Sequence, residues 1–277
     1  MRLRDLLVVH DGSARSDVAL GAALGVARHH DARVSCFCPL ELLYVSSVGV
    51  SLVGDPKALA PQMGANRFGA QVLEKARSIE TDFYERLERN GVQGDWQISE
   101  GLAVDDVARR ALRADLLVLG QPAPDHPLTP MAHHLAEAAL INSGRPLLFV
   151  PFAGHFTSIG TNVLLEWNET REAARSAHDA LLLIEPTAAV TVLTIERRSL
   201  PGTPREIPSA DIAEHLARHG LRVSAASTVT DACISDADVL LAYASDNGAD
   251  LLVVGGYEHS RTRELRDHMT LPVLMSH

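Results

Sequence analysis

Short apolar runs alternate along this chain with longer stretches in which apolar residues recur at every third or fourth position. The first run, Leu6-Leu7-Val8-Val9, is ended by the polar residues His10-Asp11-Gly12-Ser13. A continuously apolar run of this length is typical of a strand buried on both faces of a parallel sheet, and the longer stretches predict helices. This alternation predicts an α/β fold with a doubly wound, parallel, five-stranded sheet in the first half. Its strands are expected at 6–9, 34–37, 96–99, 116–119 and 147–150.

The second half of the chain repeats the first. Ala114-Asp115-Leu116-Leu117-Val118-Leu119-Gly120 recurs as Ala249-Asp250-Leu251-Leu252-Val253-Val254-Gly255, and a proline-led apolar strand follows each copy. A repeat of this length predicts two copies of one α/β unit, each of ordinary domain size. We therefore expect domains at 1–153 and 160–277. The strands of the second are expected at 163–167, 190–195, 221–226, 251–254 and 273–275.

Composition narrows the class of protein. The 277 residues include 46% hydrophobic and 22% charged residues, as in globular domains, and 25 basic against 35 acidic residues give a net charge of −10. A negative chain argues against nucleic acid or an anionic membrane as a partner. The apolar runs fall far short of the roughly 20 residues of a membrane helix. No signal peptide precedes the first strand, and three cysteines fit no disulfide framework, so we expect a cytoplasmic location.

The strand ends carry a family resemblance. Val8-Val9-His10-Asp11-Gly12-Ser13, which opens a helix, and the motif 114–120 resemble the universal stress proteins. In the second half, the segments 167–175 and 255–265 and the tail 268–277 resemble the tandem bacterial members of that family. The resemblance implies two Rossmann-like domains of the adenine nucleotide α-hydrolase type and a regulatory, stress-adaptive role without catalysis. It also implies that the domains pack as an internal pseudo-dimer through their last strands, with a further homodimer left open.

The resemblance also implies where ATP or AMP would bind. Nucleotide-binding members of the family hold adenine near the aspartate that ends strand one. They hold phosphates on a loop written Gly-two-Gly-nine-Gly-Ser/Thr, whose backbone N–H groups approach the oxygens. Asp11, Gly12, Ser13 and Gly120 are the matching candidates in the first half. In the second half the candidates are Asn168, Gly255, Gly256, Ser260 and Arg261.

Both phosphate loops depart from the family pattern. After Gly120 the second glycine position is Ala123, between Pro122 and Pro124, and the closing pair is His133-His134. Prolines have no N–H to donate, so this connection cannot form the same anion cradle. After Gly255 the second glycine position is Glu258, and the connection to Pro272 is shorter than its counterpart by nine residues.

We therefore expect a degenerate nucleotide site, with phosphate-dependent ATP binding weak or absent and a protein partner of unknown identity. Two alternatives stay open: an ATP-using enzyme of the same fold group, and a binder of a non-nucleotide small molecule beneath the loop 44–66. Asp11-Gly12-Ser13 is also an ordinary turn and helix cap, and Gly120 and Gly255 are also ordinary turn residues. No metal site is expected, because the histidines lack ligand spacing, and no catalytic residue is assigned.

Overall fold

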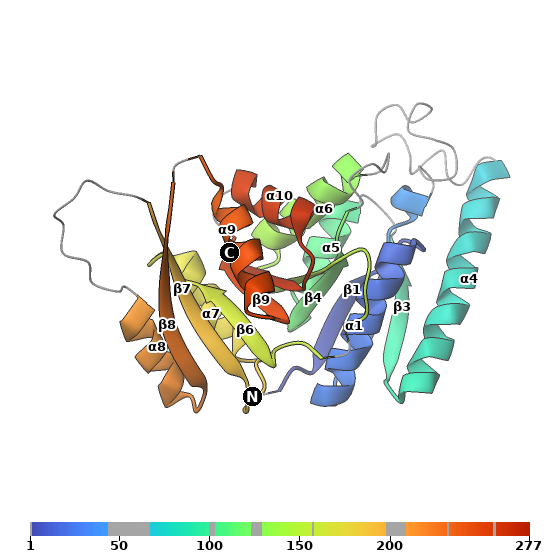
Figure 1. Ribbon diagram of the computed structural model, residues 1–277. Helices are drawn as coiled ribbons and strands as arrows, with labels where there is room; N and C mark the ends of the chain where they lie inside the picture. The colour runs from blue at the N-terminus through green and yellow to red at the C-terminus, as the bar shows by residue number, and fades with distance from the viewer. Residues whose placement is uncertain are drawn as a thin grey trace. The chain divides into compact units, whose positions relative to one another are not determined.

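The computed structural model describes residues 2–43, 67–99, 103–122, 129–156, 158–197, 209–231, 233–256 and 259–277. The chain forms two compact units, Met1–Thr157 and Ser158–His277 (Figure 1). The loop 44–66, expected as a cover for a site, lies outside the described residues. Within the described part, no helix is long and apolar enough to cross a membrane.

The first unit is a five-stranded parallel sheet in the order β3-β2-β1-β4-β5. The predicted fold class is therefore confirmed for this half, including all five strands. In chain order, its elements are β1 (Asp5–Val9), α1 (Ala14–His30), β2 (Arg33–Cys38), α4 (Arg67–Asn90), β3 (Gly94–Ile98), α5 (Ala103–Ala111), β4 (Leu116–Gly120), α6 (Thr129–Asn142) and β5 (Leu147–Val150).

The second unit repeats this topology, with the parallel strand order β8-β7-β6-β9-β10. The first strand of each unit is thus central, and the chain reverses direction across the sheet after the third strand. The elements are β6 (Asn162–Glu166), α7 (Arg171–Ala180), β7 (Ala189–Arg197), α8 (Ser209–Arg218), β8 (Arg222–Thr230), α9 (Asp236–Asp246), β9 (Leu251–Gly255), α10 (His259–His268) and β10 (Val273–Ser276).

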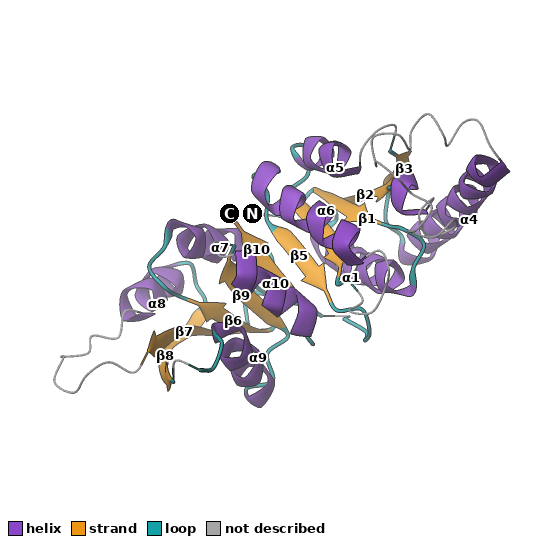
Figure 2. Cartoon of the chain, turned by 90° about the horizontal axis from the view of Figure 1, so that it is seen from above, coloured by secondary structure: helices purple, strands orange, loops and turns teal. Residues whose placement is uncertain are grey.

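Helices cover both faces of each sheet, as right-handed crossovers require (Figure 2). In the first unit, α1 packs with α4, and α5 packs with α6. The α4 helix buries one apolar stripe, at Val72, Ala76, Phe83 and Leu87, which explains its strong periodicity in the sequence. Cys36 and Cys38 of β2 are also fully buried, as expected of core residues.

The repeated aspartate has the same structural role in both units. Asp115, just before β4, accepts backbone hydrogen bonds from Arg4 and Asp5 at 2.7 and 3.1 Å, where β1 begins. Asp250, just before β9, accepts backbone N–H groups of residues 160–162 at 3.0–3.1 Å, where β6 begins. The aspartate is thus kept in both copies because it bonds the start of the first strand of each sheet, an arrangement that we call the aspartate clamp. Packing of the two units through their last strands stays a prediction.

Candidate functional site

A small cavity opens at the carboxyl ends of β1 and β4 in the first unit, where ligands bind in open parallel sheets. Its volume is about 30 Å³. Apolar side chains form most of its lining, including Val9, Leu119 and Leu135. Asp11 and Arg15 contribute charge to the same lining, so the predicted residue Asp11 does lie at a cavity.

Asp11 is already bonded on both of its carboxylate oxygens. Oδ1 accepts the backbone N–H of Ser13 at 3.1 Å and the Ser13 hydroxyl, and Oδ2 accepts Nη2 of Arg15 at 2.6 Å. Burial opposes ionisation of this carboxyl, but the charge of Arg15 and the hydrogen bonds from Ser13 and Arg15 outweigh it and lower its pKa to about 2. Asp11 is therefore an ionised carboxylate held by its own chain.

Arg15 is the residue that the sequence reasoning missed. It is the second residue of α1, and its side chain is only 9% exposed, as is that of Asp11. Nη2 bonds Asp11, whereas Nη1 is buried and has no hydrogen-bond partner among the residues that the structure describes. The spacing of Asp11 and Arg15, four residues apart across a helix start, was the signal that could have found this pair.

Gly12 and Ser13 shape the turn that carries Asp11. Gly12 has a φ of +72°, and an added Cβ would meet Cδ1 of Ile79, on α4, at 2.5 Å. Ser13 caps α1 by accepting the N–H of Ser16, whose hydroxyl in turn accepts the N–H of Ser13. These two candidates therefore have ordinary structural roles, as turn and cap, beside any contact with a ligand.

Polar residues of α1 and α4 surround this turn. Nε2 of His10 lies 3.3 Å from Oδ1 of Asp17, which also accepts Nη2 of Arg86 at 2.7 Å. The hydrogen bond from His10 outweighs burial and, with the charge of Arg86, lowers the pKa of Asp17. Lys75 of α4 places its Cε 3.5 Å from the position that a Cβ on Gly12 would take. The lysine therefore adds positive charge beside Asp11 and Arg15.

Gly120 is required by close packing between β4 and the start of α1. A Cβ at Gly120 would lie 2.8 Å from the carbonyl oxygen of Arg15 and 3.1 Å from its carbonyl carbon. Both are backbone atoms, so they cannot turn aside as a side chain could. The N–H of the next residue, Gln121, is bonded to the carbonyl of Val150 at 2.7 Å. The glycine therefore has a packing role that needs no phosphate.

Comparisons with solved structures agree with this fold and its duplication. A universal stress protein from Archaeoglobus fulgidus matches with a TM-score of 0.75 and 12% identity, over 98% of this chain and 95% of that one. The chain has the universal stress protein fold. A Pseudomonas aeruginosa protein of unknown function also matches, with a TM-score of 0.53 and 16% identity, over 99% and 92% of the two chains. No protein-family model and no curated protein matches the sequence.

Within the universal stress protein fold, the second unit carries different chemistry at the equivalent strand end. Asn168 takes the place of Asp11, and its Oδ1 accepts the hydroxyl of Thr170 at 2.7 Å. Glu172 takes the place of Arg15; it is buried and bonded by the neighbouring Arg171. The acid-and-arginine pair of the first unit therefore has no counterpart here. Glu169, at the position of Gly12, has a φ of +59°.

The remaining candidates of the second unit are explained in part. A Cβ on Gly255 would lie 2.8 Å from the backbone nitrogen of Ala173, so this glycine, like Gly120, permits close approach of a helix start. The N–H of Gly256 is bonded to the carbonyl of Ser276 at 2.8 Å. Ser260 and Arg261 lie in α10, and their side chains lie outside the described residues.

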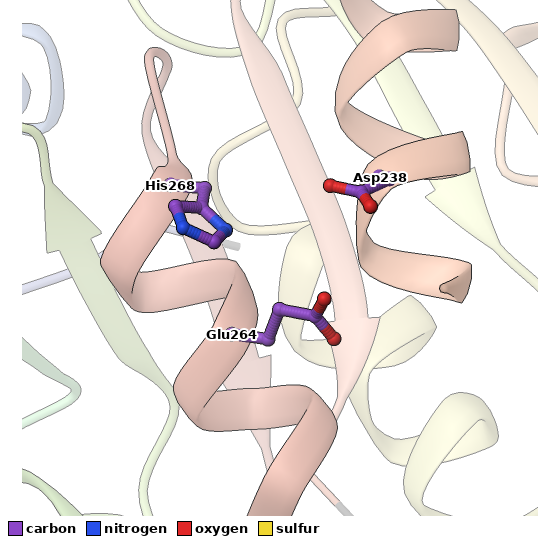
Figure 3. Close-up of side chains that lie close together, drawn as sticks. All are labelled: Asp238, Glu264 and His268. Atoms are coloured by element: carbon purple, nitrogen blue, oxygen red, sulfur yellow. The ribbon is translucent and has the colours of Figure 1, made fainter. Parts of the chain in front are cut away.

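One group of side chains in the second unit has the donor types of a metal site. Ligand atoms of Asp238 on α9 and of Glu264 and His268 on α10 all lie within 4.8 Å of one another (Figure 3). Glu264 and His268 are one helical turn apart, a spacing that could have been read from the sequence. Carboxylate and imidazole ligands suit Zn²⁺ or Mn²⁺, but Asp238 and His268 are exposed. Proximity is the one observation that favours a cation at this group.

Proposed function

We propose that the protein belongs to the regulatory universal stress proteins and acts by binding a ligand or a protein partner, not by catalysis. We further propose that its nucleotide site is degenerate and that ATP or AMP is not its main ligand. The observation that carries this proposal is the pairing of Asp11 with Arg15 and Ser13. A carboxylate whose oxygens are already bonded is a poor acceptor for a nucleotide.

Releasing Asp11 for a nucleotide would be costly. Breaking a buried ion pair leaves an uncompensated charge and typically costs about 3–5 kcal/mol. The nucleotide would have to recover that cost from phosphate contacts. The connection after Gly120, which would hold the phosphates, contains Pro122 and Pro124, and these donate no N–H. Gly120 itself is explained by close packing against α1.

The same features argue against the rival function, an enzyme that uses ATP to activate a substrate. Such chemistry needs donors aimed at the transferring phosphoryl group. The prolines after Gly120 remove backbone donors, and Arg15 has one nitrogen engaged with Asp11, which leaves a single donor in place of several. Steady release of phosphate or pyrophosphate from ATP by the purified protein would favour the enzyme and contradict our proposal.

Titration calorimetry with ATP, ADP and AMP tests the proposal directly. We expect no saturable binding in the micromolar range. A thermal-shift panel gives an independent readout, because a ligand at a hundred times its Kd adds about 2.7 kcal/mol of stability. Micromolar ATP binding that Asp11→Ala abolishes would show that the site is a working nucleotide site.

A further inference from the structure

The unpaired nitrogen of Arg15 indicates that something at this site accepts a hydrogen bond. Nη1 is buried and has no acceptor among the residues described, while its twin Nη2 holds Asp11. Buried donors in folded proteins are almost always paired with protein, water or a ligand. A guanidinium is a planar fork, so it can bond Asp11 with one nitrogen and a second acceptor with the other.

The cavity that Arg15 lines limits the size and character of that acceptor. A single buried water needs about 10–15 Å³ of such volume, so about 30 Å³ holds two or three water-sized groups. Most of the other lining residues are apolar, with Val9, Leu119, Leu135 and Ala136 among them. An acceptor group with one or two attached carbons matches both the polar and the apolar side.

The charges around the cavity favour an anion. Asp11 and Arg15 cancel each other, and Lys75 adds one positive charge at the turn. Asp17 and Asp82 share Arg86 in a separate cluster on α1 and α4. The charge of Lys75 also acts on the buried Cys38 of β2. Burial and the charge of Asp11 raise the pKa of Cys38 to about 12, and the positive charge of Lys75 partly offsets this rise. The positive charge of Lys75, next to the neutral pair of Asp11 and Arg15, suits a small anion.

We propose that this cavity binds a short-chain monocarboxylate of two or three carbons. One carboxylate oxygen accepts Nη1 of Arg15, Lys75 adds long-range attraction, and the methyl or ethyl group packs against Leu119 and Leu135. The assignment rests on the ligand-binding role proposed above and names its ligand class. A phosphate is disfavoured because it needs several converging donors, whereas Arg15 offers one free nitrogen and Pro122 offers none.

The test is an NMR titration of the full-length protein with acetate and propionate, with propionamide and inorganic phosphate as comparison ligands. We expect saturable, millimolar binding of the two carboxylates, as the small number of ligand atoms allows. Propionamide has nearly the same shape without the charge, so it should bind at least tenfold more weakly.

Three variants separate this site from nonspecific binding. Ala136→Leu fills the cavity without touching either charge, and the double variant Asp11→Asn/Arg15→Gln removes both charges together, so that neither is left buried alone. Each of these two variants should weaken propionate binding at least tenfold. Arg89→Gln removes one exposed positive charge far along α4, where Arg89 pairs with Glu85 at 3.3 Å, and should leave propionate binding within twofold.

Failure to saturate, or binding unchanged by Ala136→Leu, would overturn the inference and leave water as the acceptor. Equal weakening by Arg89→Gln would show general charge attraction and would also overturn it. The ATP titration on the same samples keeps the two proposals apart. If neither ATP nor propionate binds, the proposal of a degenerate nucleotide site is still supported. Micromolar ATP binding would contradict that proposal whether or not propionate binds.

Discussion

Replacing Gly120 by alanine decides whether this glycine serves packing or phosphate binding. The added Cβ would lie 2.8 Å from the carbonyl oxygen of Arg15, against an ordinary contact of at least 3.4 Å. The start of α1 would therefore have to move by about 0.6 Å, although its cap and the ion pair of Asp11 hold it in place. Overpacking of this size costs about 1–3 kcal/mol.

Urea unfolding followed by circular dichroism measures this cost. With a slope of about 2 kcal/mol per molar urea, Gly120→Ala should lower the midpoint of the first unit by about 0.5–1.5 M. Gly255→Ala should do the same in the second unit, because its Cβ would meet backbone atoms of Glu172 and Ala173 at 2.8–2.9 Å.

Gly21 supplies the matched control. It lies inside α1, and nothing lies within 4 Å of an added Cβ. Gly21→Ala should therefore stabilise the protein by about 0.5–1 kcal/mol, through helix propensity alone. A Gly120→Ala variant within about 0.5 kcal/mol of wild type would refute the packing argument, since surface substitutions alone give changes of that size.

Three further outcomes are expected. The pKa of Asp11 is lowered from 3.8 to about 2, so its pairing stabilises the fold by about 2 kcal/mol above pH 4. This stabilisation is lost as the pH falls towards 2. The free energy of unfolding of Asp11→Asn/Arg15→Gln should lack that pH dependence. Glu169→Gly should raise stability in urea by about 0.5–1 kcal/mol by relieving a left-handed backbone, and a loss of stability would contradict this. Mass spectrometry after alkylation of the native protein should find exposed Cys233 labelled and buried Cys38 protected, and equal labelling would argue against the buried β2 strand.

The fold could be predicted from sequence because its signals are local and occur twice. The runs Leu6–Val9 and Leu116–Leu119 are apolar throughout, as is typical of strands covered on both faces. The repeat at 249–255 indicated two units. The parallel, doubly wound class followed from the alternation of strands and helices, whereas the strand order is known only from the structure.

The site was harder to predict because its decisive contacts are set by packing. Asp11 was recognised as a strand-end acid, but an arginine in the first turn of a helix usually faces solvent, so its burial against Asp11 was not apparent. The role of Gly120 depends on the backbone of Arg15, which is distant in sequence and only close in the folded sheet. Glu264 and His268 were not singled out from the sequence, and their proximity to Asp238 on another helix is set by packing.

The aspartate clamps join residues that are synthesised far apart in time. Asp115 lies 111 residues after its partner Arg4, and Asp250 lies 88 residues after Asn162. In both units the first strand made by the ribosome becomes the centre of the sheet, but the residue that anchors its start is made among the last. We infer that each unit stays open until its fourth strand has emerged, so that a chain stopped before Asp115 exposes an apolar central strand to the chaperones of the cell.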